Sequence, residues 1–293
     1  MDTTLWEKGT ATFNRWSTQL THLNGNWGKF RVKHRLQRIL SKFIPRIIIS
    51  TIRKLRHQKF LLSRFKKIRY FFEEKSGLEI GGPSNLFSSE LPIYEIVTAL
   101  DNVNFANKTL WEKGLTSHGT FEFSSVRKSK GTQFICEASD LSEIQDHSYD
   151  FLISSNCLEH IANPIKALHE WKRVIGLNGI ILLVVPRKES NFDHRRDTTS
   201  FVHIRQDFLD NTDEQSMIHL PEILELHDLQ RDPAAGTFTE FHERSLANFT
   251  NRGLHHHVFD EKLLNELVEH VGFEIVYSFQ TDSDYFCLAK SIG

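Results

Sequence analysis

The stretch YDFLISSNCLEHIANPIKALHEWKRVIGLNGIILLVVP, residues 149–186, decides the fold. It opens with a short apolar run at 149–156 and closes with another at 179–186, and both runs have the length of strands. Between them, Asn163 is a favourable helix cap and Pro164 suits the first position of a helix. A strand, a helix and a strand in this order predict two parallel strands joined by a crossover helix.

The rest of the chain extends this pattern in both directions. Three further strands are predicted upstream, at 77–80, 93–101 and 132–139. Downstream, a helix capped by Asp260 precedes two strand-like runs, FEIVYSFQ and DYFCLAKS, that lie only a few residues apart. A gap that short permits an antiparallel pair but cannot hold a crossover helix. We therefore expect an α/β fold with a seven-stranded, mostly parallel sheet that ends in an antiparallel hairpin.

Charge is segregated along the chain. Of the 36 Lys and Arg, 15 lie within 29–69, which holds no Asp or Glu, and the rest of the chain carries 21 against all 37 acids. Apolar residues recur there at spacings of three and four, which predicts basic amphipathic helices broken near Pro45. We expect a basic, mostly helical N-terminal region, 1–75, and a domain, 76–293, with an insertion at about 187–258 that belongs to no strand.

The basic region has three interpretations. It caps the domain with its charges in water, lies on an anionic membrane surface, or contacts the phosphates of a nucleic acid. The aliphatic and Phe content of its apolar faces favours the membrane interface. The N-terminus lacks a signal-peptide pattern, no apolar run has the length of a membrane span, and the three cysteines form no CxxC pair. The expected location is cytoplasmic, with peripheral contact at the inner face of a membrane.

Two stretches carry a resemblance to a known family: LEIGGPS, residues 78–84, and ASDLSEIQDHSYDFLISSNCLEHI, residues 138–161. They resemble motifs of the class I S-adenosylmethionine-dependent methyltransferases, of the type 11-like kind, over roughly residues 70–290 without the insertion. The resemblance implies a Rossmann-like sheet and S-adenosyl-L-methionine as cofactor. NAD is the competing cofactor, but its fingerprint needs a third glycine before the helix, and here Pro83 and Ser84 follow the two glycines.

The resemblance and the chemistry of each position predict the cofactor site, at the carboxyl ends of strands where open α/β sheets bind ligands. Gly81 and Gly82 let the methionine part approach the backbone, and Glu79 would accept from its ammonium group. Asp101, expected to end the second strand, would take both ribose hydroxyls. The expected cofactor-binding residues are Glu79, Gly81, Gly82, Pro83, Ser84, Asp101, Asn102, Glu137, Ala138, Asp140, Ser155 and Asn156.

The insertion is where we expect the substrate to be selected, because it gathers His, Arg and Asp. A hydroxyl acceptor must lose a proton, and His is the usual base, while Arg can hold a phosphate or carboxylate. The expected catalytic residues are His194, His203, His256 and, outside the insertion, His160. The expected substrate-binding residues are Asp193, Arg195, Arg196, His255 and His257. Metal binding and inert surface histidines are the alternatives, although the spacings match no defined metal motif.

The predicted function is S-adenosylmethionine-dependent methyl transfer. The polar insertion favours O-methylation of a small polar or carbohydrate-like acceptor, free or lipid-linked. Two alternatives stay open at this point: an RNA methyltransferase that uses the basic N-terminal region, and a non-catalytic binding protein with the same fold.

Overall fold

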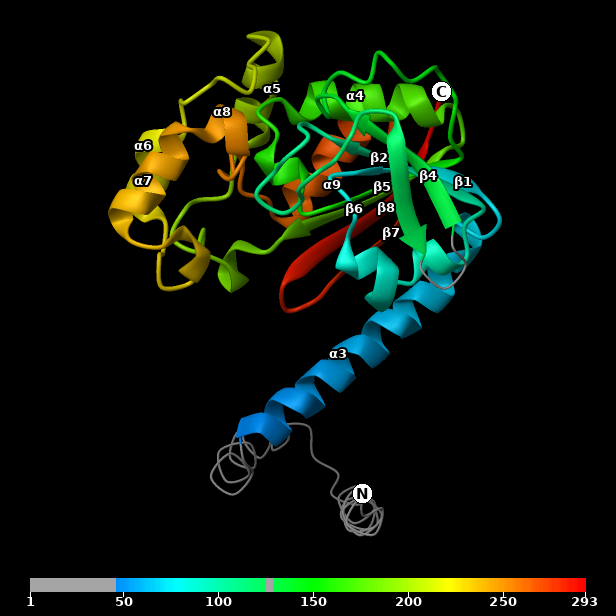
Figure 1. Cartoon of the computed structure of the whole chain (residues 1–293), viewed down its shortest axis with the longest axis horizontal. Helices are drawn as coiled ribbons and strands as arrows, with labels where there is room; N and C mark the ends of the chain where they lie inside the picture. Colours follow the sequence, from blue (N-terminus) through cyan, green and yellow to red (C-terminus); the bar gives the residue numbers. More distant parts are fainter. Residues whose placement is uncertain (1–45, 125–128) are drawn as a thin grey trace. The chain divides into compact units, whose positions relative to one another are not determined.

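The architecture is a mixed β-sheet covered by helices (Figure 1). A computed structural model describes residues 46–124 and 129–293. Within these residues the sheet has eight strands in the order β3-β4-β2-β1-β5-β6-β8-β7. Their bounds are β1 Ser76–Ile80, β2 Ala99–Asn104, β3 Gly119–Ser124, β4 Ser129–Ile135, β5 Phe151–Ser155, β6 Ile180–Pro186, β7 Phe273–Gln280 and β8 Asp284–Ser291.

Five central strands confirm the predicted parallel sheet. β1 pairs in parallel with β2 and β5, β2 with β4, and β5 with β6. The predicted hairpin is also confirmed, since β8 pairs antiparallel with both β6 and β7. The predicted number of seven strands is wrong, because β3 adds an antiparallel edge strand next to β4. The carboxyl ends of β1, β2, β4 and β5 therefore meet along one edge of the sheet.

Two predicted strands have the wrong bounds. Residues 93–95, taken as the start of the second strand, form a 3-10 turn, and β2 begins only at Ala99. Ile93 and Tyr94 are nevertheless fully buried, so their apolar character reflects packing rather than strand pairing. The predicted third strand, 132–139, is β4, which starts earlier and ends at Ile135.

One face of the sheet is covered by α4, Pro164–Ile175, and α9, Glu261–His270. Both helices start at the predicted caps: the side chain of Asn163 accepts from Lys166 N at 3.1 Å, and that of Asp260 accepts from Leu263 N at 2.7 Å. Their apolar sides pack against inward-facing strand residues such as Leu152. Each such buried side chain contributes about 1.5–3 kcal/mol.

The opposite face is covered in part by the end of α3, Arg46–Ile68. The contacts divide the chain between Gln58 and Lys59, and the second unit includes residues 59–75 of the predicted N-terminal region. In this unit, buried side chains of Leu61, Phe65 and Ile68 pack in the same core as Phe151 of β5. This part of the basic helix therefore caps the sheet. The helices predicted within 29–45 lie outside the described residues, and the anionic partner of the basic region stays a prediction.

The predicted insertion carries short helices and no strand of the sheet, as expected (Figure 1). These helices are α5 Phe201–Leu209, α6 Leu220–Leu226, α7 Phe238–Leu246 and α8 Asn248–Asn251. Figure 1 shows α6, α7 and α8 grouped beside one end of the sheet. Ile223, Ala235, Phe241 and Leu254 form a small core of their own there. Across the described residues, no helix is both long and apolar enough to cross a membrane.

Candidate functional site

The turn after β1 is open on one side and tightly held on the other. Gly81 is exposed and has a φ of 82°, which an L side chain rarely adopts. Gly82 is buried, and its N–H donates to the Asn102 side-chain oxygen at 3.0 Å. The Gly82 carbonyl accepts from the side-chain amides of Asn102 at 3.0 Å and Asn104 at 2.8 Å. A Cβ on Gly82 would stand 2.3 Å from the Glu79 carboxyl, so only glycine fits this position.

The side chain of Glu79 packs against the glycine turn and hydrogen-bonds to it. Its carboxyl group is 1% exposed and accepts from Ser84 N at 3.1 Å and from the Tyr94 hydroxyl. Burial raises the pKa of Glu79 to about 8, although both hydrogen bonds act in the opposite direction. In this structure the side chain positions the backbone that would receive the cofactor. Direct contact with the cofactor's ammonium group stays a prediction.

Asp101 does not end its strand, and this prediction is wrong. It is the third residue of β2, which continues to Asn104. Three residues of strand place it roughly 10 Å below the carboxyl edge. Its carboxylate accepts from Thr132 N at 2.6 Å and from the Tyr149 hydroxyl at 2.7 Å. Asp101 thus joins β2 to neighbouring segments, and its position does not favour ribose binding. Asn102 is fully buried and holds the glycine turn instead.

The other predicted cofactor residues follow β4 and β5, next to the glycine turn. Among them Asp140 and Asn156 are exposed, and Glu137, Ala138 and Ser155 are half-buried. Pro83 is exposed and Ser84 half-buried in the turn itself. A Cβ on Gly81 would lie 3.1 Å from the Cys157 sulfur, which brings the segment after β5 against the turn. This edge offers an open surface for a nucleotide.

Sequence analysis missed Arg252, which links the insertion to this edge. Arg252 is 5% exposed and pairs with Glu137 beyond the end of β4. Its guanidinium lies 5.1 Å from the ring centre of Phe105, which follows β2, and 4.9 Å from that of Phe249. A lone Arg in a loop gives no sequence signal for such a contact. Because of it, the insertion covers part of the predicted nucleotide edge.

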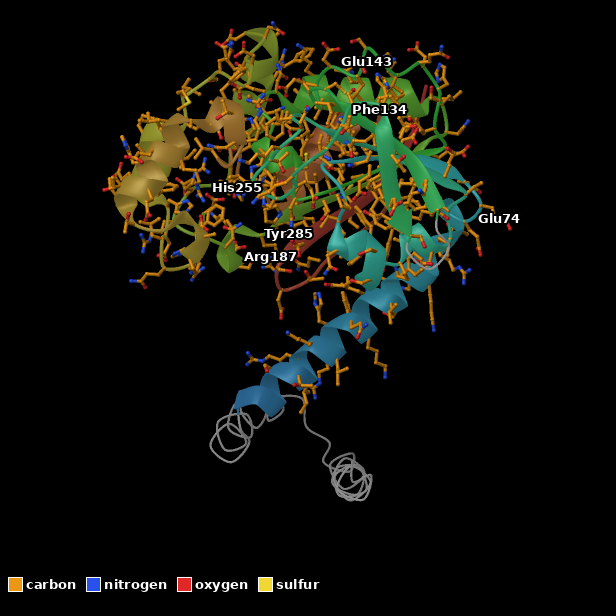
Figure 2. All side chains as sticks on the ribbon, viewed as in Figure 1. Glu74, Phe134, Glu143, Arg187, His255 and Tyr285 are labelled. Carbon is orange, nitrogen blue, oxygen red and sulfur yellow. The ribbon has the colours of Figure 1, made fainter. Side chains whose placement is uncertain are left out.

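A narrow pocket, closed to water-sized molecules in this conformation, lies where the insertion meets the ends of β5 and β6, near the position of His255 in Figure 2. Its lining residues are Glu159, Pro186, Lys188, Asn191, Asp193, His255, His257, Val258 and Phe259. Glu159 is only two residues beyond Cys157, a distance of at most about 7 Å along the chain. The pocket is therefore close to the glycine turn.

Asp193 and His255 form a buried pair in the wall of this pocket. Nδ1 of His255 lies 2.5 Å from Oδ2 of Asp193. Burial opposes the charge on both groups, but their mutual attraction outweighs it: the pKa of Asp193 is lowered to about 2 and that of His255 is raised. Because the hydrogen bond with Asp193 uses Nδ1, Nε2 of His255 takes no part in the pair. Asp193, expected to bind substrate, pairs with His255 here, and a substrate contact stays a prediction.

Glu159 and His160 lie beside this pair. Both carboxyl oxygens of Glu159 are buried without a hydrogen-bond partner, and burial raises its pKa to about 7. His160 Nδ1 lies 3.0 Å from the carbonyl of Leu254, so this nitrogen donates and Nε2 carries the lone pair. The His160 and His255 rings are 4.6 Å apart. Predicted catalytic His160 thus reaches the site, whereas the unpartnered Glu159 was not predicted.

The geometry of Arg196 does not favour its predicted anion-binding role, which stays a prediction. Its guanidinium is 2% exposed and donates to Asp193 at 3.0 Å, to the His255 carbonyl at 2.8 Å and to the His256 carbonyl at 3.3 Å. Every one of these partners belongs to the insertion, so Arg196 holds the loop that carries His255. A sequence pattern of adjacent arginines cannot distinguish this role from substrate binding.

The neighbouring pair faces outward. Nε2 of His194 lies 2.8 Å from Asp228, and Arg195 contacts the same carboxylate at 3.4 Å with half of its side chain exposed. Neither residue lines the pocket. The catalytic role of His194 and the substrate role of Arg195 stay predictions that this geometry does not favour.

The three consecutive histidines face different surroundings, as adjacent side chains should. His255 meets Asp193, His256 lies 3.2 Å from the Asn248 amide, and His257 lies 3.7 Å from Asp207. Burial lowers the pKa of His256 to about 3, so this ring is neutral, and its catalytic role stays a prediction. His257 lines the pocket as well, and with the predicted catalytic His203 it also forms a second cluster.

This geometry fits S-adenosylmethionine. The exposed Gly81 leaves room for close approach to the backbone, and Glu137, Ala138 and Ser155 would contact the nucleotide part. A parallel sheet with this turn and a final hairpin is the architecture of a methyltransferase of this class. Residues 51–278 match the family model described as Methyltransferase domain, and the chain belongs to that family. S-adenosylmethionine is its expected cofactor.

Solved structures of low sequence identity resemble the chain as well. A SAM-dependent methyltransferase from Aquifex aeolicus is 13% identical, with 78% of this chain and 88% of that one covered at a TM-score of 0.44. A SAM-dependent methyltransferase from Methanosarcina mazei is 17% identical, with 75% and 93% covered at a TM-score of 0.41. Among curated proteins none matches. The family assignment rests on the family model.

Proposed function

We propose that this methyltransferase acts on a hydroxyl group of a small polar, carbohydrate-like acceptor. The observation that carries the proposal is the Asp193–His255 pair in the wall of a narrow pocket beside the glycine turn, which must widen to admit an acceptor. A hydroxyl is a weak nucleophile until its proton is removed, and a positioned His contributes about 10²–10⁴-fold to such a step. Acceptors that are already nucleophilic, such as a free amine, do not need a general base in this position.

Each residue then has a defined task. Asp193 holds the Nδ1–H of His255, which presents Nε2 to the acceptor, as in other acid–histidine pairs. Nε2 takes the hydroxyl proton while the acceptor oxygen forms its bond to the methyl carbon. When bound, S-adenosylmethionine would supply the methyl group from its sulfonium, and the sulfur of the S-adenosylhomocysteine product would keep the electron pair of the broken bond. Glu159 and Asn191 line the same pocket and would hydrogen-bond further hydroxyls of the acceptor.

The polar lining supports a hydrophilic acceptor. Five of the nine lining residues carry a charge or an imidazole, and they converge at the carboxyl ends of two strands. Whether the acceptor is lipid-linked depends on α3. That helix contains no acid and has Lys66 and Lys67 in its last turn, which suits an anionic membrane surface. We propose such a surface as the partner of α3, with RNA as the competing outcome of the vesicle assay described below.

The test uses the full chain with methyl-labelled S-adenosylmethionine and three acceptor panels: hexoses and hexose phosphates, primary amines, and a ribo-oligonucleotide. We expect label on oxygen in the first panel, identified by mass spectrometry of the product. The variant His255→Gln should lose about 10²–10⁴-fold in kcat, with S-adenosylmethionine affinity unchanged. The matched control is His242→Gln, a histidine of the same insertion that stacks on Phe238 outside the pocket.

Two results would contradict the proposal. One is methyl transfer to amines or RNA alone, and the other is a His255→Gln variant that turns over a hydroxyl acceptor as fast as the His242→Gln control. Cofactor binding without transfer to any panel would instead favour the non-catalytic alternative.

A further inference from the structure

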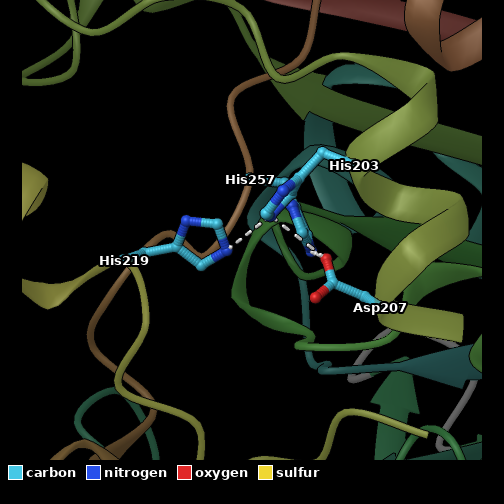
Figure 3. A group of neighbouring side chains, drawn as sticks. All are labelled: His203, Asp207, His219 and His257. Carbon is cyan, nitrogen blue, oxygen red and sulfur yellow. Dashed lines mark hydrogen bonds and ion pairs between the residues drawn. The ribbon is translucent and has the colours of Figure 1, made fainter. Parts of the chain in front are cut away.

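Four side chains from three separate segments converge at a second place in the insertion (Figure 3). His203 and Asp207 are one turn apart on α5, His219 immediately precedes α6, and His257 belongs to the segment before α9. We call this group the His/Asp cluster. Each member offers one nitrogen or carboxylate oxygen, and these four atoms all lie within 4.8 Å of one another.

The spacing of these atoms matches a tetrahedral ion site. Metal–ligand distances of about 2.0–2.1 Å place neighbouring ligands of tetrahedral Zn²⁺ roughly 3.3 Å apart. Nε2 of His203 lies 3.2 Å from Nε2 of His219 and 3.3 Å from Oδ2 of Asp207. Nε2 of His257 lies 3.7 Å from the same oxygen. Two of the six edges of the tetrahedron thus already have this length, a third is close to it, and the other three are no longer than 4.8 Å.

Protein contacts alone leave this cluster unsatisfied. Asp207 is 5% exposed and its Oδ2 has no hydrogen-bond partner, even though two imidazoles face it. His257 is fully buried, and its Nδ1 also lacks a partner. Burial lowers the pKa of His219 to about 4 and holds that of His257 well below its usual value, so both rings offer a neutral nitrogen, the form in which histidine binds metal.

The cluster would add to the hydrophobic anchor of α5. Ile204 is buried and Phe201 packs partly buried against the core, while Val202 and Leu209 are mostly exposed. This is a limited anchor for a helix of nine residues. A bond network through His203 and Asp207 would fasten α5 to the segments that carry His219 and His257. The other oxygen of Asp207 accepts from the Thr212 hydroxyl at 3.1 Å, as supporting groups around metal sites do.

We propose that the His/Asp cluster binds one divalent transition-metal ion, with Zn²⁺ preferred, as a structural site. The donor set of three imidazoles and one carboxylate suits Zn²⁺. Four protein ligands complete a tetrahedral shell, which is the pattern of structural rather than catalytic zinc. Binding requires Nε2 of His257 to release its contact with the Ala162 carbonyl, now 3.2 Å away, and to pass its proton to Nδ1 or to water. The half-exposed side chain of His203 provides an entry path.

The experiment measures metal binding directly and does not depend on activity. The full chain, purified without a polyhistidine tag and treated with a chelator, is titrated with Zn²⁺ by calorimetry and with Co²⁺ by visible absorption. We expect one equivalent of Zn²⁺, the visible bands of tetrahedral Co²⁺, and a rise of roughly 5–10 °C in Tm at about 100 times the Kd.

Variants locate the site. We expect His219→Gln and Asp207→Asn to weaken Zn²⁺ binding by more than the roughly 10–100-fold that loss of a supporting group costs. His219 is half-buried at the start of a helix, so its variant should fold even if Asp207→Asn does not. The matched control is His194→Gln, because His194 also pairs with an aspartate but has Arg195 rather than further ligands beside that carboxylate.

A wild-type chain that binds neither ion would overturn the proposal, and so would His219→Gln binding Zn²⁺ as tightly as His194→Gln. Both readouts are independent of methyl transfer, so a failed acceptor screen leaves this test intact.

Discussion

Glu79 makes the stability of this protein depend on pH in an unusual direction. Its carboxyl group is 1% exposed and has a pKa of about 8, against 4.5 for a free side chain. Between these two values the folded chain keeps a proton that the unfolded chain has released. The free energy of unfolding must therefore fall as the pH rises through this window, and the contribution of Glu79 is lost as the pH passes 8.

The magnitude follows from the same two values. One pH unit corresponds to about 1.4 kcal/mol per proton when the folded state alone holds it. From pH 6 to pH 8 the contribution of Glu79 should fall by about 2 kcal/mol, slightly less than the full value because the group is half titrated at the upper end. The variant Glu79→Gln keeps the shape and cannot titrate, so this part of the slope should disappear.

Urea unfolding at pH 6, 7 and 8 and constant ionic strength measures the effect as the difference between the two proteins, which cancels the titration of the histidines. Glu143→Gln is the matched control, since Glu143 has a half-exposed side chain whose ion-pair contact is with His118 at 3.7 Å. If Glu79→Gln shows the same loss of stability from pH 6 to 8 as the wild type and the control, the burial argument for Glu79 is refuted.

Three further predictions concern the cofactor edge, the insertion and α3. Asn102→Ala removes the hydrogen bonds that hold the glycine turn, so calorimetry should show S-adenosylmethionine affinity reduced about 10–100-fold. Asp101→Ala should instead cost ~1–3 kcal/mol of stability with affinity nearly unchanged; equal affinity losses would contradict the placement of both residues. Arg252→Gln should free the insertion from the segment after β4 and speed its cleavage by chymotrypsin about 10-fold. This corresponds to a free energy of local opening lower by ~1.4 kcal/mol. An unchanged cleavage rate would count against the contact. The double variant Arg53→Gln and Arg56→Gln should bind phosphatidylserine vesicles about 10–30-fold more weakly, at ~1 kcal/mol per lost charge. If the wild type does not bind vesicles but binds RNA in a salt-sensitive way, the RNA alternative is favoured.

The fold could be predicted where local signals agree with the global pattern. Asn163 and Asp260 cap the helices that sequence analysis placed there, and the short gap before β8 fixed an antiparallel hairpin. The edge strand β3 escaped because it lies at the edge of the sheet, where pairing rather than composition defines a strand. Ile93 and Tyr94 were predicted as strand because they are apolar, but over so short a run the hydrophobic pattern has no period that would distinguish a strand from a buried turn.

The candidate site was only partly predictable, because partners distant in sequence decide each role. The glycine turn follows from local geometry, and its position at the end of β1 was expected. That Arg196 is a structural donor and Asp193 an orienting acid depends on the path of the segment that carries His255. Consecutive histidines reveal that their rings diverge but not which residues they meet.

The central claim is that the turn after β1 binds S-adenosylmethionine, and calorimetric titration of the cofactor and of S-adenosylhomocysteine tests it most directly. The comparison is between Gly81→Ala and Gly114→Ala, since both glycines have positive φ, 82° and 77°, but a Cβ on Gly114 meets nothing within 4 Å. Both variants carry a similar backbone cost of about 1–2 kcal/mol, and thermal unfolding confirms that each is folded. We predict that wild type and Gly114→Ala bind one equivalent of either compound and that Gly81→Ala binds at least about 10-fold more weakly. A folded wild-type chain that binds neither compound, or equal binding by the two variants, would contradict the account.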